Sequence, residues 1–222
     1  MDYKARSAYK DSKIVNEYDS KRFYSIRGKV INFLEKSAIE KAIKYIALPA
    51  ASEILDLPCG TGRISIFLAE KGYKVMGGDI SPEMIDKVRE NARRIGMNGQ
   101  TEFQVLDAEK IDCANSHFDA VVSLRFFGHT PPEVRKRVLM EFKRVGKKYF
   151  IFSYYLKNSL QEILRRKKRL AAGIPWYPVS FKDIDQEMKQ VGIKKIKIFP
   201  VLKYFSETVV VLGEASYSNG NK

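Results

Sequence analysis

Three aspartates, Asp56, Asp79 and Asp107, each stand at or near the end of a short apolar segment. The segments read "SEILDL", "YKVMGGD" and "TEFQVLD", and helical patterns follow the first two of them. This alternation is typical of a parallel sheet, in which ligands bind at the carboxyl ends of the strands. The sequence therefore predicts that three carboxylates converge on one ligand at that edge.

A glycine turn follows the first predicted strand and contains Gly60 and Gly62. Glycine permits a positive φ and lets a ligand approach the backbone closely. Asp79 comes nineteen residues after Gly60. An acid at about this separation is placed to accept hydrogen bonds from two ribose hydroxyls. A strand, turn, helix, strand and acid in this order predict a nucleotide-like cofactor.

Two residues distinguish this unit from a dinucleotide site. The third position of the dinucleotide glycine pattern is Ser65, and Asp56 would repel a pyrophosphate. S-adenosylmethionine has no phosphate, and a carboxylate at Asp56 would attract its sulfonium and ammonium groups, directly or through water. Asp107 is placed to accept a hydrogen bond from an adenine amino group, or equally well to cap a helix. A nicotinamide-dependent oxidoreductase is therefore the disfavoured alternative.

The stretches "ILDLPCGTG", "GGDIS" and "VLDAE" resemble, in this order, the motifs of class I S-adenosylmethionine-dependent methyltransferases. The resemblance covers about residues 50–155. It implies that the glycine turn holds the methionine side of the cofactor, that the second strand ends at the ribose and that the third ends at the adenine. The cofactor-binding residues that it implies are Asp56, Pro58, Gly60, Gly62, Asp79, Ile80, Asp107, Ala108, Ser123, Leu124 and Arg125.

Pro58 departs from the family pattern, which usually has glycine at this place. Proline removes a backbone N–H and fixes φ near about −65°. Both effects are tolerable at the last residue of a strand, beside a turn whose permissive points are Gly60 and Gly62. We therefore expect Pro58 to stiffen the strand end without abolishing cofactor binding.

Strands alternate with helices from residue 52 onward, which predicts an α/β fold. The last two predicted strands are joined by only "VLKYFS", too short for a parallel crossover, so they should pair antiparallel. The resemblance implies a Rossmann-like, mostly parallel sheet in the order 3-2-1-4-5-7-6, with strand 7 antiparallel. We expect an N-terminal helical cap over residues 1–50 and a methyltransferase domain over 51–213 with a basic helical insertion at about 156–178. A flexible tail should occupy 214–222.

The predicted cap contains one long helix, which Pro49 ends. Its apolar residues recur near a 3.6-residue period, and Val30 and Phe33 belong to this predicted buried face. Before the helix, an aromatic stretch could close over the cofactor, and Arg22 or Arg27 could pair with the cofactor's carboxylate or with an anionic acceptor. A cap that only packs on the sheet is equally consistent with the pattern.

Two residues at the same edge are candidates for catalysis, His129 and Tyr155. Methyl transfer is an in-line displacement, so alignment supplies most of the rate, and a base is needed only for a protonated acceptor. His129 could deprotonate a hydroxyl near neutral pH, or it could simply begin a helix. Tyr154 and Tyr155 end the fifth predicted strand and should point to opposite sides, one toward the acceptor and one into the core.

The chain carries a net charge of +14, and its densest basic run is Arg165–Arg169. Leu160, Ile163, Leu164 and Leu170 share one face of the same predicted helix. The helix could lie on an anionic membrane surface, grip a phosphorylated substrate, or present a solvated face. Nucleic acid is a less favoured partner, because it rests on charge alone and no recognition module is visible.

The 222 residues suffice for one domain with a sizeable core. No apolar run reaches the roughly 18 residues of a membrane span, and the first residues lack the apolar core of a secretory signal. Neither cysteine lies in a metal-ligand pattern, so we expect a cytoplasmic protein without a metal. The predicted activity is methyl transfer from S-adenosylmethionine to a small-molecule, lipid-head or sugar acceptor. The alternatives are an RNA methyltransferase, an NAD(P)-dependent oxidoreductase and a non-catalytic S-adenosylmethionine-binding protein.

Overall fold

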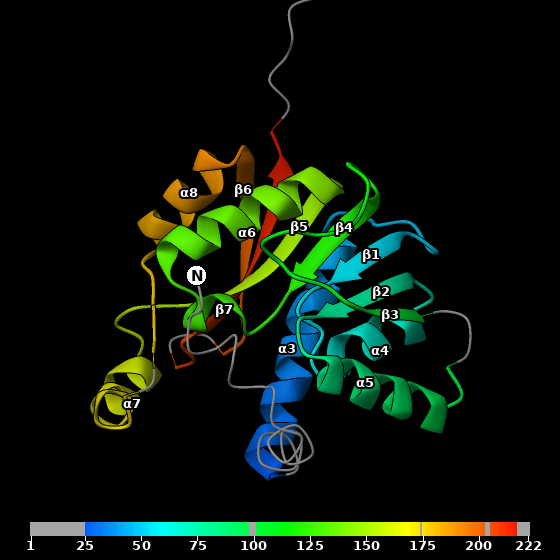
Figure 1. Ribbon diagram of the computed structural model, residues 1–222. Coiled ribbons are helices and arrows are strands. Elements are labelled where there is room, and N and C mark those ends of the chain that lie inside the picture. The colour runs from blue at the N-terminus through cyan, green and yellow to red at the C-terminus, as the bar shows by residue number, and fades with distance from the viewer. Residues whose placement is uncertain (1–24, 98–100, 174, 203–204, 217–222) are drawn as a thin grey trace, which may run out of the picture.

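The computed structural model describes residues 25–97, 101–173, 175–202 and 205–216. In this part of the chain one sheet is formed by β1 (Glu53–Asp56), β2 (Lys74–Asp79), β3 (Thr101–Val105), β4 (Phe118–Ser123), β5 (Gly146–Tyr155), β6 (Ile193–Pro200) and β7 (Thr208–Ala215). The strand order is β3-β2-β1-β4-β5-β7-β6 (Figure 1). Neighbours are parallel from β3 to β5, whereas β7 runs antiparallel to β5 and β6. The predicted order and the antiparallel strand are both confirmed.

Helices cover both faces of the sheet (Figure 1). One face packs against α3 (Ile26–Tyr45), α4 (Arg63–Glu70) and α5 (Pro82–Arg94), and the other against α6 (Pro132–Val145) and α8 (Phe181–Gln190). Two further elements follow strands directly: the 3₁₀ turn η1 (Phe127–His129) comes after β4, and α7 (Leu160–Ala171) comes after β5. Both therefore lie at the carboxyl edge of the parallel strands.

Strand β4 shows why the centre of the sheet is apolar on both faces. Val121 packs into the core cluster beneath α6 and α8, whereas Ala120 and Val122 pack into the cluster beneath α3 and α4. All three residues are fully buried. Successive side chains of a strand point to opposite faces, so a strand covered on both faces needs an uninterrupted apolar run. The loops at the carboxyl edge are thus carried by a rigid centre.

Helix α3 packs on the sheet only along its second half. Ile39 and Ala42 are fully buried, as the apolar period predicts. Val30 and Phe33 are 51% and 69% exposed, so the prediction that they belong to the buried face is wrong. The sheet covers only the second half of α3. The start of the helix extends past the carboxyl edge of the sheet, so Val30 and Phe33 have no sheet to pack against (Figure 1).

Parts of the predicted domain division lie outside the described residues. Residues 1–24, which hold Arg22 and the aromatic stretch predicted to close over the cofactor, are among them, as are residues 217–222 of the predicted tail. Strand β7 continues to Ala215, so the sheet includes the first two residues of the segment expected to be a tail. Within the described ranges, no helix has the length and apolar character needed to cross a bilayer.

Candidate active site

Asp56 is a buried carboxylate at the end of β1. The Ser65 hydroxyl, in the first turn of α4, donates a hydrogen bond to Asp56 Oδ2 at 2.6 Å. Burial raises the pKa of Asp56 to about 7, although the Ser65 hydrogen bond opposes this shift. In the described ranges no cation pairs with Asp56. The charge of Arg63 also lowers the pKa of Asp56, but the Arg63 guanidinium pairs with Glu35, at 2.9 Å. An unpaired buried carboxylate is costly, so this site fits a ligand that brings a positive charge.

Asp79 ties the end of β2 to the glycine turn. Its Oδ2 accepts a hydrogen bond from the Gly60 backbone N–H, and its Oδ1 accepts one from the Ser81 N–H, both at 3.0 Å. Asp79 is also buried, and burial raises its pKa. Ser81 in turn caps α5 by accepting from the Met84 N–H at 3.1 Å. The turn, the acid and the start of the next helix therefore form one connected unit.

The turn after β1 needs glycine at Gly62. This residue has a φ of +88°, which L side chains rarely adopt. A Cβ at the same place would lie 2.1 Å from Cγ2 of Val88 on α5. Gly62 therefore lets α4 and α5 approach each other at the start of α4, beside the predicted cofactor position.

Pro58 lies two residues past the end of β1, joined to Leu57 by a cis peptide bond. The flanking backbone groups stay paired. Leu57 N donates to Val122 O at 3.0 Å, and Cys59 N donates to Gly78 O at 2.7 Å. The missing N–H of proline thus falls between two backbone hydrogen bonds to the neighbouring strands, which is consistent with the expectation that Pro58 is tolerated.

Asp107 follows β3 and begins a turn. Its Oδ1 accepts a hydrogen bond from the Glu109 N–H at 2.9 Å, and its backbone bridges to Lys110. No helix begins there in the described residues, so the reading of Asp107 as a helix cap is wrong. Ala108 beside it is buried, and Ile80 after β2 is half-buried. Carboxyl groups therefore stand at the ends of β1 and β2 and two residues past the end of β3, at or near the strand ends as the sequence predicts.

The end of β4 is fixed to α3 by an ion pair. Ser123 and Leu124 are buried, and the Arg125 guanidinium contacts both carboxylate oxygens of Glu35 at 2.8 to 3.1 Å. The Arg125 N–H donates to the Ser153 hydroxyl at 2.6 Å. Glu35 is fully buried, which sequence reasoning missed because a glutamate in a helix usually faces solvent. The segment predicted to pass the cofactor is thus held from both sides.

A cavity of about 370 Å³ opens at the same edge, and we call it the rim cavity. It is bounded by the start of α3, the loop after β4, the end of β5, α7 and the residues before β7. His129, Tyr155 and Arg125 all line it. The two predicted catalytic residues therefore share one cavity with the last of the predicted cofactor-binding residues.

His129 and Tyr155 are both held against Trp176. The ring centroids of His129 and Trp176 are 5.1 Å apart, and those of Tyr155 and Trp176 are 4.5 Å apart. His129 Nδ1 lies 3.3 Å from the Pro175 carbonyl oxygen, which can only accept, so this contact places the proton of a neutral ring on Nδ1 and the basic site on Nε2. Tyr154 points the other way and packs on Phe127 in the core.

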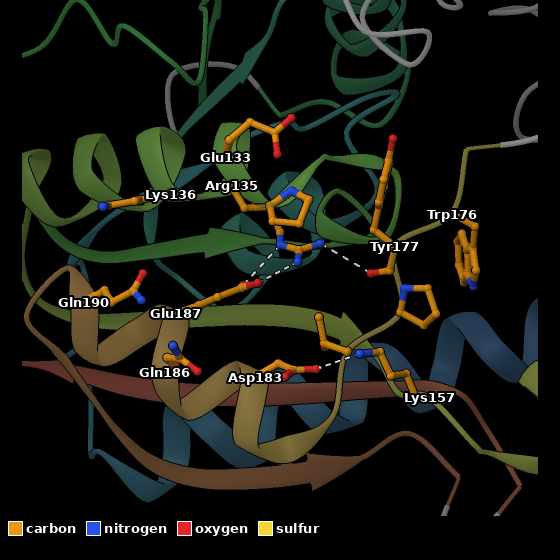
Figure 2. A pocket seen from close by; sticks show the side chains of 13 residues that line it. Glu133, Arg135, Lys136, Lys157, Trp176, Tyr177, Asp183, Gln186, Glu187 and Gln190 are labelled. Carbon is orange, nitrogen blue, oxygen red and sulfur yellow. Dashed lines mark hydrogen bonds and ion pairs between the residues drawn. The ribbon is translucent and has the colours of Figure 1, made fainter.

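A second cavity, of about 640 Å³, lies between α6, α8 and the loop that carries Trp176 and Tyr177 (Figure 2). Arg135 is buried in its wall and pairs with Glu187 at 2.6 Å. The same guanidinium donates to the carbonyl oxygens of Phe127, Thr130 and Tyr177. Arg135 thus joins η1, α8 and the Trp176 loop, and it positions the wall that this cavity shares with the rim cavity.

Residues 54–148 match the model of a family described as a methyltransferase domain. Magnesium protoporphyrin IX methyltransferase from Synechocystis, solved with bound S-adenosylhomocysteine, is similar over 93% of this chain and 100% of that chain, with a TM-score of 0.73 and 21% identity. The chain therefore has the Rossmann-like fold that is also found in class I S-adenosylmethionine-dependent methyltransferases, and residues 54–148 match the methyltransferase domain model.

Two curated relatives align with parts of the chain. An uncharacterized RNA methyltransferase of Oceanobacillus iheyensis is 41% identical over 76 residues, which are 34% of this chain and 16% of that protein. An S-adenosyl-L-methionine-dependent Diels-Alderase of Talaromyces variabilis is 30% identical over 92 residues, which are 40% of this chain and 32% of that protein. The chain thus spans less than a third of the length of these relatives.

Proposed function

We propose that the protein is an S-adenosylmethionine-dependent methyltransferase that binds its cofactor along the carboxyl ends of β1 to β4. The observation that carries the proposal is Asp56, a buried carboxylate beside the glycine turn that no cation of the described chain pairs with. A sulfonium or ammonium group would supply the missing charge. When bound, the cofactor supplies an electrophilic methyl group that a nucleophile of the acceptor takes by in-line displacement.

The residues around the turn have separate tasks in this proposal. Asp56 attracts the cationic part of the cofactor, and Asp79 accepts hydrogen bonds from the ribose hydroxyls. Asp107 accepts from the adenine amino group, while Ile80 and Ala108 pack beside the ring. Gly60 and Gly62 keep the backbone open to the methionine part. The segment Ser123–Arg125, held by Glu35, borders the rim cavity from which the acceptor approaches.

The acceptor enters through the rim cavity, whose volume suits a small molecule or the head of a lipid or sugar. His129 Nε2 takes the proton of the acceptor when the nucleophile is a hydroxyl. Tyr155 orients the acceptor from the end of β5. Both residues reach the cavity through elements fixed by the sheet, which supports positioning as the main source of rate.

Three alternative functions differ in the observations that favour them. An RNA substrate is supported by the names of three relatives, each an uncharacterized RNA methyltransferase, and by the net charge of +14. A non-catalytic role for bound S-adenosylmethionine is supported by the relative named as a Diels-Alderase, since that name describes no methyl transfer. A nicotinamide-dependent oxidoreductase is disfavoured, because Asp56 would repel a pyrophosphate. Ser65, at the place of the third glycine of the dinucleotide pattern, donates its hydroxyl hydrogen bond to Asp56.

Two measurements test the proposal. Calorimetric titration should show binding of S-adenosylmethionine and S-adenosylhomocysteine, and labelled methyl groups should appear on a component of fractionated cell extract. Tight NAD binding without a response to S-adenosylmethionine would refute the cofactor assignment. Binding without transfer to any fraction, RNA included, would refute the methyltransferase and favour the non-catalytic alternative.

We also propose that the outer face of α7 contacts an anionic membrane surface. Ile163, Leu164 and Leu170 are 56%, 68% and 72% exposed, and Lys167 and Lys168 beside them are exposed as well. Apolar and cationic side chains together complement an anionic lipid surface. The run Arg165–Arg169 divides in the structure, because Arg165 and Arg169 line the rim cavity while the residues between them do not.

Replacing Arg166, Lys167 and Lys168 together with glutamine should weaken sedimentation with anionic vesicles by about tenfold or more, since each cation contributes on the order of 1 kcal/mol near such a surface. A matched control removes three exposed cations elsewhere, Arg93, Arg94 and Lys110. Equal loss in both variants would mean that net charge alone is responsible. No loss in either variant would mean that this face of α7 contacts only solvent.

A further inference from the structure

The rim cavity has more positive than negative charge. Arg27, Arg125, Arg165 and Arg169 line it, together with a single glutamate, Glu207. Arg125 pairs with Glu35, which lies outside the lining and also pairs with Arg63. Glu207 is buried and accepts two hydrogen bonds from Arg169, at 2.8 and 2.6 Å. Arg27 and Arg165 are the two lining guanidinium groups that make no short contact with a carboxylate of the described residues.

The wall of the rim cavity that carries Arg165 is held in place by several side-chain contacts. Arg169 is fixed by its bidentate pair with Glu207 and lies over the Trp176 ring, 3.7 Å from the ring centroid. Gln161 accepts a hydrogen bond from the Glu207 N–H at 3.3 Å. Gln161, Arg165 and Arg169 are spaced by four residues, so one face of α7 points into the cavity. The neighbouring faces carry the exposed side chains.

Arg165 contacts the carboxylate of Glu207, which already forms two shorter hydrogen bonds with Arg169. Its Nη1 lies 3.4 Å from Glu207 Oε1, a long contact beside the two short ones of Arg169. Burial, together with the charges of Arg27 and Arg169, lowers the pKa of Arg165 against the attraction of Glu207. No carboxylate in the described ranges pairs with Arg27, which approaches from α3. Two cations from separate helices thus face one space, and a bound anion would relieve their repulsion.

We propose that Arg27 and Arg165 bind an oxyanion group, a carboxylate or a phosphate, of the methyl acceptor in the rim cavity. The inference rests on the proposed function and names the substrate class of the same site. Because His129 and Tyr155 line the same cavity, the anionic group fixes one end of the acceptor while its nucleophile stays near the end of β4. A planar guanidinium matches carboxylate and phosphate geometry equally well, so both anions belong to the class.

Trp176 is the only tryptophan of the chain, and it lines the rim cavity against Arg169. Its fluorescence therefore reports on anions there. Titration of the full chain with inorganic phosphate or malonate should change the fluorescence in a saturable way that chloride at equal ionic strength does not reproduce. In Arg165→Gln and Arg27→Gln the apparent dissociation constant should rise at least tenfold. Lys182→Gln, which removes an exposed cation outside the cavity, is the matched control.

Calorimetry with S-adenosylmethionine separates this inference from the proposed function. Both arginine variants should bind the cofactor like the unchanged protein. If Arg27→Gln weakens cofactor binding and leaves the phosphate titration unchanged, Arg27 serves the cofactor's own carboxylate and the inference is wrong, while the proposed function stands. If the unchanged protein binds phosphate saturably but not S-adenosylmethionine, the proposed function fails instead.

Labelled methyl transfer then identifies the source of the anion. Acceptors are offered as matched pairs, each acid beside its amide and each phosphate ester beside its alcohol, in free solution and as lipids in vesicles. The anionic member should be preferred at least tenfold in the unchanged protein, and this preference should disappear in the double variant of Arg27 and Arg165. Preference for the neutral members, or equal responses to phosphate and chloride, would overturn the inference.

Discussion

Replacing Asp79 with alanine is expected to weaken S-adenosylmethionine binding by ten- to a hundredfold, or about 1.4 to 2.7 kcal/mol. The carboxylate is predicted to accept two hydrogen bonds from the ribose, and hydrogen bonds to a charged group contribute about 1.5 to 3 kcal/mol each. The same carboxylate also holds the Gly60 and Ser81 N–H groups, so its loss loosens the turn as well. Calorimetric titration measures the change directly.

Two controls separate the ribose contact from collapse of the turn. Asp79→Asn keeps the size of the side chain and one acceptor oxygen, so it should lose less affinity than alanine. Asp112→Ala removes an exposed carboxyl group elsewhere and should change nothing. S-adenosylhomocysteine has the same ribose and should weaken in parallel. Affinity for both ligands that is unchanged in Asp79→Ala would contradict the assignment of Asp79 to the ribose.

The parts of the fold that were predictable from the sequence depend on local patterns. Apolar runs that end in an acid specified β1, β2 and β3, and the capping signal at Ser81 specified the start of α5. The short last connection specified the antiparallel strand. These features involve residues within a few positions of one another, where spacing alone determines which face or which end a side chain occupies.

The pairs that shape the acceptor side were not predictable, because they join distant residues. Glu35 and Arg125 are 90 residues apart in the sequence, and Glu207 and Arg169 are 38 apart. A glutamate in a helix or before a strand reads as a surface residue, and no local spacing marks it as the partner of a buried arginine. The exposure of Val30 has the same origin, since it depends on where α3 leaves the sheet.

Ser65 shows an intermediate case. Its position in the sequence indicated only that the third glycine of a dinucleotide pattern was missing. The structure gives it a partner nine residues earlier, the carboxylate of Asp56. The sequence pattern therefore argued against a dinucleotide cofactor. The contact of the Ser65 hydroxyl with Asp56 could be found only from the fold of the turn between β1 and α4.

Cofactor binding should depend on pH through Asp56, whose pKa burial raises to about 7. Below this pH the ligand-free carboxyl is protonated and does not attract a cation. Affinity for S-adenosylmethionine should therefore be constant above pH 7 and fall by about tenfold for each unit below it, because one pKa unit corresponds to about 1.36 kcal/mol. At pH 5 binding should be about a hundredfold weaker than at pH 8. Calorimetry in buffers of different ionisation enthalpy would also detect the proton released on binding below pH 7.

Asp56→Asn separates the contribution of this carboxyl from that of every other group in the protein. The variant should bind weakly at every pH and lose the slope between pH 5 and 7. Folding provides an independent check of the sign. A carboxyl whose pKa is higher in the folded state binds its proton there, so the ligand-free protein should lose stability, relative to Asp56→Asn, as the pH rises from about 4 to 7. A slope that survives in Asp56→Asn would assign the pH dependence to another group and remove the main support for a cation at this carboxylate.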